Sequence, residues 1–152
     1  MEAIFARIDK KLKKLRDKEQ DLSNPSNYLA IASHNDIEEI NKKWKLPDVY
    51  LNFIKNYSPI KAELKSRDYG RVNVYGAHNL IKNQQGYSYN PVTKAVIEDW
   101  NKNFVVIADK GAAPFCIDVT MEDCPVYFAL HGEGTWEFEK VYDTFIDFIR
   151  KF

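Results

Sequence analysis

Apolar residues recur at steps of three and four in some parts of the chain and alternate with polar residues in others. In the first part, the apolar positions are Ile4, Phe5, Ile8, Leu12 and Leu15. This spacing forms one apolar stripe along a helix, with lysines and arginines largely on the other side. We therefore expect an N-terminal amphipathic helix over residues 1–22. Because acidic residues interrupt its positive charge, docking on its own domain is favoured over membrane binding.

Two more helices are predicted before residue 60. Residues 33–35 offer N-cap side chains, acidic residues follow in the first turn, and the apolar face consists of Ile37, Ile40 and Trp44. Leu46-Pro47 ends this helix, and proline favours the first position of a new one. The next helix is therefore expected over residues 48–57, up to Ser58-Pro59.

The second half of the chain changes to strand patterns. A short strand with a glycine turn is expected at RVNVYG, and four strands in succession are expected at FVVIAD, FCIDV, PVYFALHG and TWEFEKVY. Gly111 supplies the turn of one hairpin, and Gly132 and Gly134 the turn of another. Asp143 or Thr144 then caps a closing helix rich in phenylalanine.

This order of elements predicts an α+β fold, because the alternation of strand and helix that builds parallel sheets is absent. We expect a mainly antiparallel sheet, connected as a meander, with the N-terminal and C-terminal helices covering one of its faces. The chain has 152 residues, which is the size of one ordinary domain. One domain over residues 1–152 is the expectation.

Composition narrows the setting in which the protein works. No apolar run is long enough to span a bilayer, and the N-terminus lacks an apolar signal segment, so we expect a cytoplasmic protein that does not enter membranes. Two cysteines are too few for a secreted disulfide framework. The formal net charge is zero, which gives no general reason to bind nucleic acid.

The charge is unevenly distributed. Residues 95–147 hold eleven acidic and three basic side chains, so the remainder of the chain is basic. An acidic surface steers a basic partner toward itself. The residues that we expect to contact such a partner are Asp109, Asp118, Glu122, Asp123, Glu133, Trp136, Glu137 and Glu139. Taken singly, each acidic side chain is better explained by a solvated surface, and Trp136 is at least as well explained by core packing.

The cysteines and histidines are candidates for a catalytic or a metal site, but each also has a simpler interpretation. Cys116, His131 and Asp118 contain the groups of a thiol nucleophile, a base and an orienting carboxylate. However, Cys116 lies inside an alternating strand and no oxyanion-hole motif accompanies it, so a packed cysteine is favoured. The cysteines and histidines also lack the close pair that zinc sites usually show. We expect no catalytic residue, no metal and no cofactor.

Four stretches taken together resemble the SUKH superfamily. They are the helix and Leu-Pro segment IEEINKKWKLPDVYLNFIKNY, the strand and turn VNVYG, Trp100 with FVVIADKGAAPFCIDV, and PVYFALHGEGTWEFEKVYDTFIDFI. Their order carries the resemblance, which covers roughly residues 33–150 and leaves the N-terminal helix as an addition. One difference is Ser58-Pro59-Ile60, where family members often have Asn-Gly-Gly, so the turn at this place must differ.

The superfamily contains immunity proteins of bacterial polymorphic toxin systems and fungal cell-wall assembly regulators. The resemblance implies a non-catalytic protein that binds a cognate toxin domain, encoded by a neighbouring gene and commonly a nuclease, and neutralises it. The alternative that it implies is an intracellular regulatory scaffold that binds peptides or proteins. Neither function follows from the residues alone, since one fold serves several functions.

Overall fold

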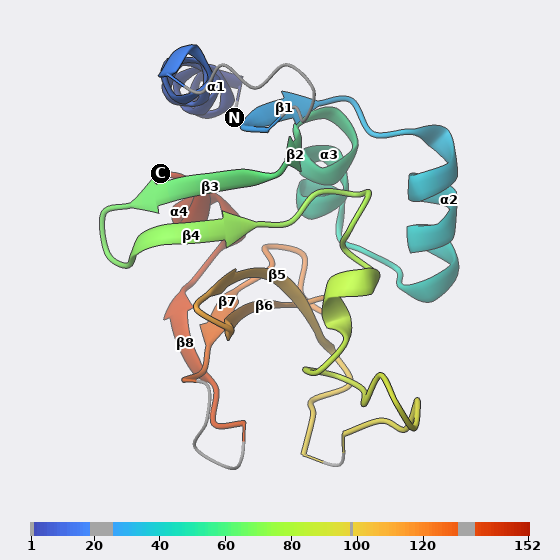
Figure 1. Cartoon of the computed structure of the whole chain (residues 1–152). Helices are drawn as coiled ribbons and strands as arrows, with labels where there is room; N and C mark the ends of the chain where they lie inside the picture. Colours follow the sequence, from blue (N-terminus) through green and yellow to red (C-terminus); the bar gives the residue numbers. More distant parts are fainter. Residues whose placement is uncertain (1, 19–25, 98, 131–135) are drawn as a thin grey trace.

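Six strands form one antiparallel sheet in the order β3-β4-β5-β6-β7-β8, and two short strands, β1 and β2, form a second sheet. The computed structural model describes residues 2–18, 26–97, 99–130 and 136–152 (Figure 1). The helices are α1 (Glu2–Lys18), α2 (His34–Lys43), α3 (Asp48–Asn56), the 3-10 helix η1 (Lys82–Gln84) and α4 (Phe145–Ile149). The strands are β1 (Tyr28–Ala30), β2 (Ser58–Ile60), β3 (Ala62–Ser66), β4 (Gly70–Val74), β5 (Phe104–Lys110), β6 (Ala113–Asp118), β7 (Val126–Phe128) and β8 (Glu139–Tyr142). The α+β fold class and the meander predicted from the sequence are confirmed.

The helix ends follow from local chemistry. The Ser33 hydroxyl accepts a hydrogen bond from the Asp36 N–H at 3.1 Å and so caps α2. At α4 the cap is Thr144, whose hydroxyl accepts from the Asp147 N–H at 3.0 Å. The sequence left open whether Asp143 or Thr144 capped this helix, and the structure selects Thr144.

The N-terminal helix docks on the domain through its apolar stripe. Phe5, Ile8 and Leu12 are buried, and the Phe5 ring stacks on Tyr57 with ring centroids 4.1 Å apart. Helix α1 ends at Lys18, and residues 19–22 of the predicted helix lie outside the described residues. The expected docking on the protein's own domain is therefore confirmed for α1.

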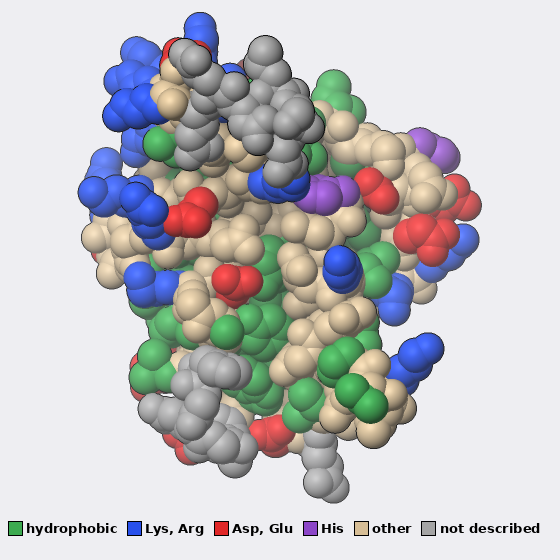
Figure 2. All heavy atoms as spheres, in the orientation of Figure 1, with side chains coloured by type: hydrophobic (Ala, Val, Ile, Leu, Met, Phe, Trp, Pro, Cys, Tyr) green, Lys and Arg blue, Asp and Glu red, His purple; other side chains and the backbone are tan. Residues whose placement is uncertain are grey.

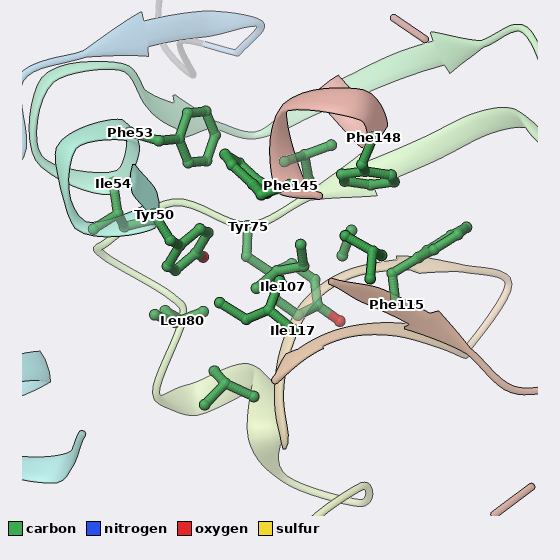
Figure 3. Close-up of a cluster of buried hydrophobic side chains, with 14 of the residues drawn as sticks. Tyr50, Phe53, Ile54, Tyr75, Leu80, Ile107, Phe115, Ile117, Phe145 and Phe148 are labelled. Atoms are coloured by element: carbon green, nitrogen blue, oxygen red, sulfur yellow. The ribbon is translucent and has the colours of Figure 1, made fainter. Parts of the chain in front are cut away.

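The core lies between helices α3 and α4 and the central strands (Figure 3). Figure 3 shows the rings of α3 and α4 facing the side chains of β5 and β6. The Tyr50 and Phe145 rings meet edge to face at 5.2 Å, and the Phe115 ring of β6 lies 5.3 Å from Phe148. Such aromatic pairs stabilise the core beyond the burial of their area.

The other face of the sheet, opposite the one that α3 and α4 cover, is covered as well. Cys116 and Phe104, on the face opposite Phe115, are buried. Phe104 lies against the Phe138 ring at 5.1 Å, and its carbonyl accepts from the Trp100 indole N–H at 3.3 Å. The segment between β4 and β5 therefore forms a second layer over the central strands.

Three strands were not predicted, namely β1, β2 and β3. The Pro59 carbonyl of β2 approaches Gly76 so closely that a Cβ there would meet its oxygen at 1.9 Å. Beside it, the Ala77 N–H donates to the Ser58 hydroxyl at 2.7 Å. The segment Ser58-Pro59-Ile60, which departs from the family pattern, is thus a strand packed against the end of β4.

Candidate functional site: an acidic loop between two grooves

Residues 119–125, which connect β6 to β7, form the acidic loop. A groove of about 800 Å³ lies on one side of it, lined by residues 43–49 of the α2–α3 junction and by residues 119–122. A second groove of about 320 Å³ has Glu122, Asp123, Lys140 and Asp143 among its lining residues. Met121 lines both grooves and is 51% exposed. The two grooves, together with the exposed carboxylates of Glu122 and Asp123, make this loop the candidate partner-binding surface.

Backbone and side-chain hydrogen bonds fix the course of the acidic loop. The Asp118 Oδ1 accepts from the Thr120 N–H at 2.9 Å and from its hydroxyl at 2.6 Å, so this carboxylate caps the turn. The Asp123 carbonyl accepts from the Phe145 N–H at 3.0 Å, which joins the loop to α4. The loop therefore presents exposed side chains from an anchored backbone.

Three of the predicted contact residues, Asp118, Glu122 and Asp123, come together in or beside the acidic loop. Asp143 adds a fourth carboxylate, which is paired with Lys140 at 3.0 Å. In the second groove one ammonium faces the carboxylates of Glu122, Asp123 and Asp143, so this groove is negative. Such a field favours cationic groups on an approaching partner. Lys43 and Lys45 lie across the first groove from the acidic loop.

Asp109 and Glu139 lie at the opposite end of the central strands. Asp118 pairs with Phe104 in the sheet, and Asp109 is five residues further along β5, a separation of about 17 Å at the usual rise per residue. Asp109 is half-buried and accepts a hydrogen bond from the Tyr75 hydroxyl. Burial and this hydrogen bond raise the pKa of Tyr75. The predicted acidic set therefore divides into two groups.

Trp136 belongs to an aromatic cluster that also contains Tyr87, Trp100 and Phe138. Its ring lies 5.7 Å from the Tyr87 ring and 6.1 Å from the Trp100 ring. Its backbone N–H donates a hydrogen bond to the Asp99 Oδ2 at 2.9 Å. Figure 2 shows hydrophobic side chains at the surface in the lower half of that view. Trp136 is half-buried against the core, and the neighbouring Glu137 is exposed. Glu133 lies outside the described residues, as does the predicted turn at Gly132 and Gly134.

The two cysteines have none of the surroundings of a nucleophile. Cys116 is fully buried, and burial raises its pKa well above the ordinary value. Burial also raises the pKa of Cys124 to about 12, although a backbone hydrogen bond from Tyr50 opposes this shift. A thiolate is the reactive form, so neither side chain is poised for attack at neutral pH. His131, the proposed base of the triad, lies outside the described residues.

Metal binding finds no support in the part of the chain that the structure describes. Within those residues, no three or more His, Cys, Asp and Glu side chains gather in a group that could hold a metal ion. The described helices also include none that is long and apolar enough to cross a membrane.

Sequence reasoning missed the apolar part of the candidate site. Met121 was not singled out, although it is an apolar residue directly before two acidic ones. The wall formed by Lys43–Val49 was interpreted only as the end of one helix and the start of the next. Its position opposite the acidic loop depends on the packing of α3 on the sheet, which local sequence does not contain.

The fold defines an α+β domain, and the acidic loop is its candidate binding surface. The chain belongs to the SMI1 / KNR4 family (SUKH-1), whose family model matches residues 19–151. This finding confirms the resemblance to the SUKH superfamily, which includes immunity proteins of polymorphic toxin systems. The comparison with curated proteins found no match.

Proposed function

We propose that the protein is an immunity protein, which binds a cognate toxin domain in the cytoplasm and neutralises it by covering its working surface. The observation that carries this proposal is the acidic loop, where Glu122 and Asp123 follow the exposed Met121 between two grooves and Asp118 lies directly before the loop. Family membership adds support, because the family includes toxin immunity proteins. No bond is made or broken in this mode of action.

Electrostatics favours a nuclease as the target. A nuclease binds the phosphate backbone through a cleft lined with lysine and arginine. Carboxylates that approach such a cleft speed the encounter and replace phosphate charge. A neighbouring gene is the expected source of this toxin, since an inhibitor has to be made together with the protein that it blocks.

Met121 gives the contact an apolar centre. Interfaces generally have an apolar core and a polar rim, and methionine is enriched in them because its flexible side chain adapts to irregular pockets. The two grooves beside Met121 offer room for side chains of the partner. In this arrangement the carboxylates determine orientation and rate, and Met121 contributes buried area.

A rescue assay tests the proposal. The toxin domain encoded next to this gene is co-expressed with the wild type, with Glu122→Lys/Asp123→Lys, or with Glu38→Lys/Glu39→Lys as the matched control. Glu38 and Glu39 are exposed on α2, and the control makes the same change in charge away from the acidic loop. We expect the loop variant to lose protection and to bind at least about a hundredfold more weakly, and the control to protect normally.

Circular dichroism of both variants establishes that the fold is kept. If the loop variant protects as well as the wild type, the acidic loop is not the docking surface. If the wild type itself gives no protection against the neighbouring gene product, the immunity function is wrong for that partner.

A regulatory scaffold is the second candidate, and the groove at the α2–α3 junction is the observation that favours it. With a volume of about 800 Å³ and Trp44, Leu46 and Val49 in its lining, this groove is of a size that accepts a peptide. Binding of several unrelated peptides with similar affinity, without protection against any toxin, would support this function.

A further inference from the structure

A third groove lies on a different part of the molecule, between α1 and β3. Its volume is about 420 Å³, and its apolar lining includes Leu15 and Leu64. Its rim carries the cationic side chains of Lys11, Lys14, Lys65 and Arg67. Figure 2 shows Lys and Arg side chains gathered over α1 and the nearby ends of β3 and β4. We call this site the basic groove.

Within the described residues no ion pair neutralises the positive charge of the basic groove, and only the longer-range attraction between Asp68 and Arg67 offsets part of it. There, none of its four cations has a carboxylate within ion-pair distance, and three carboxylates close to them along the chain are paired with other cations. Asp9 pairs with Arg16 at 3.9 Å. Glu63 pairs with Arg71 at 3.6 Å, and Asp68 with Lys151 at 3.4 Å. Burial, followed by repulsion from Arg7 and Arg67, lowers the pKa of Lys11. An anion in the groove would relieve this repulsion.

We propose that the basic groove is a second binding site, which takes an acidic peptide segment carrying one apolar anchor residue. The apolar floor accepts the anchor, and the four cations of the rim face carboxylates on both sides of it. Leu15, 38% exposed, supplies floor area that the anchor covers. The site is independent of the proposed immunity function, because it shares no residue with the acidic loop.

A peptide fits this groove better than a membrane or a nucleic acid. The membrane-binding stripe of an amphipathic helix is already used here, since Phe5, Ile8 and Leu12 are buried against the domain. Single-stranded nucleic acid is held by aromatic stacking as well as by cations. The aromatic ring in the lining of this groove, that of Phe152, is only 1% exposed and so offers no face on which a base can stack. In addition, β3 is an edge strand of its sheet, along which an extended peptide can lie.

Fluorescence anisotropy with the whole protein tests this inference. The probe is a fluorescein-labelled synthetic peptide of glutamates around one central leucine, and its partner probe has serine in place of leucine. Lys14→Glu/Lys65→Glu changes the groove, and Lys13→Glu/Lys61→Glu, at exposed positions outside its lining, makes the same change in charge. We expect the groove variant to bind the leucine probe at least about tenfold more weakly than the wild type does. The affinity of the control variant for this probe should fall by less than about threefold.

The serine probe should bind more weakly than the leucine probe to the wild type. Equal loss in the two variants, equal affinity for the two probes, or no binding of the leucine probe would overturn the proposal. So would equally tight binding of single-stranded RNA or of phosphatidylserine vesicles. Toxin protection by the groove variant should stay at the wild-type level, so failure here leaves the immunity function untouched.

Discussion

At the scale of single residues, the side chain of Gln84 makes hydrogen bonds to β5 that the backbone of a neighbouring strand would otherwise make. Its Nε2 donates to the carbonyls of Val106 and Leu80, both at 2.8 Å, and its Oε1 accepts from the Val106 N–H at 2.9 Å. The pairing of β4 with β5 reaches only Val74 and Ala108, so Val106 has no strand neighbour on that side. The buried amide of Gln84 satisfies both backbone groups of Val106.

We predict that Gln84→Ala lowers the free energy of unfolding by about 2–4 kcal/mol, because it leaves buried backbone groups without partners. Gln84→Glu keeps the volume but turns an oxygen toward two carbonyl acceptors, so it should cost at least as much. The exposed neighbour Gln85 gives the control, and Gln85→Ala should stay within about 0.5 kcal/mol of the wild type. Urea unfolding measures all three, and a mild effect of Gln84→Ala would contradict this account.

Sequence reasoning at this scale succeeded where the chemistry is local. A packed Cys116 was preferred over a nucleophilic one, and Cys116 is buried. The turn at Gly111 followed from its need for a positive φ, which is +53°. Gln84 was not predicted, because its partner lies 22 residues away. A polar residue in a polar segment carries no sign of such a distant backbone contact.

At the scale of elements, the helices and the four strands of the meander were predictable from periodicity. Strands β7 and β8 are shorter than predicted, and β1, β2 and β3 were missed. Strands β1 and β2 each have three residues and begin or end beside a turn signal. In β3 the inward positions are Ala62, Leu64 and Ser66, of which only one is strongly apolar. Charged residues alternate with them, as is common on an edge strand.

The β5–β6 hairpin offers a prediction about an element. Its loop has two residues between the paired Lys110 and Ala113, and Ala112 has a φ of +67° although it is not glycine. The left-handed backbone conformation costs an L-residue about 1–2 kcal/mol. Glycine avoids this cost, but it gives back part of the benefit because its unfolded state has more conformational entropy. We therefore expect Ala112→Gly to raise the free energy of unfolding by about 0.5–1 kcal/mol.

Ala113→Gly provides the opposite case for the same hairpin. Ala113 is buried in a strand without a positive φ, so this change should destabilise the protein. Thermal unfolding, monitored by circular dichroism, gives the sign of the change in Tm for both variants. A lower Tm for Ala112→Gly would show that the alanine is not strained.

At the scale of the whole molecule, the distribution of charge was predictable and its geometry was not. The acidic character of residues 95–147 is a property of the sequence. The division of these carboxylates between two ends of the central strands depends on register, which pairs Asp118 with Phe104 and Phe128 with Glu139. Register is set by long-range packing.

The C-terminus is joined to the sheet by a contact that responds to pH. The Tyr142 hydroxyl donates to the Asp68 Oδ2 at 2.6 Å, and Lys151 lies 3.4 Å from the same oxygen. The hydrogen bond from Tyr142 and the charge of Lys151 hold the pKa of Asp68 below its ordinary value of 3.8. A lowered folded-state pKa stabilises the protein above the unfolded-state pKa, and this stabilisation is lost as the pH falls through the folded-state value.

We predict that Asp68→Asn destabilises the protein at pH 7 and that the difference from the wild type shrinks below about pH 3.8. Tyr142→Phe removes the main cause of the shift, so the loss of stability caused by Asp68→Asn at pH 7 should be smaller in the Tyr142→Phe background. Urea unfolding of the wild type, the two single variants and the double variant, at pH 7 and at a pH below about 3.8, checks this. A difference that is independent of pH would exclude a role for the Asp68 charge.

The close contact of Gly76 with the Pro59 carbonyl limits which residues of this chain can be substituted. No side chain fits at residue 76, so the junction between the small sheet and β4 has to keep one shape whatever partner the protein meets. At Met121 and Glu122, by contrast, the side chains line open grooves and new ones are tolerated. Under the proposed function, a change of target therefore requires substitutions in the acidic loop and leaves the junction at Gly76 unaltered.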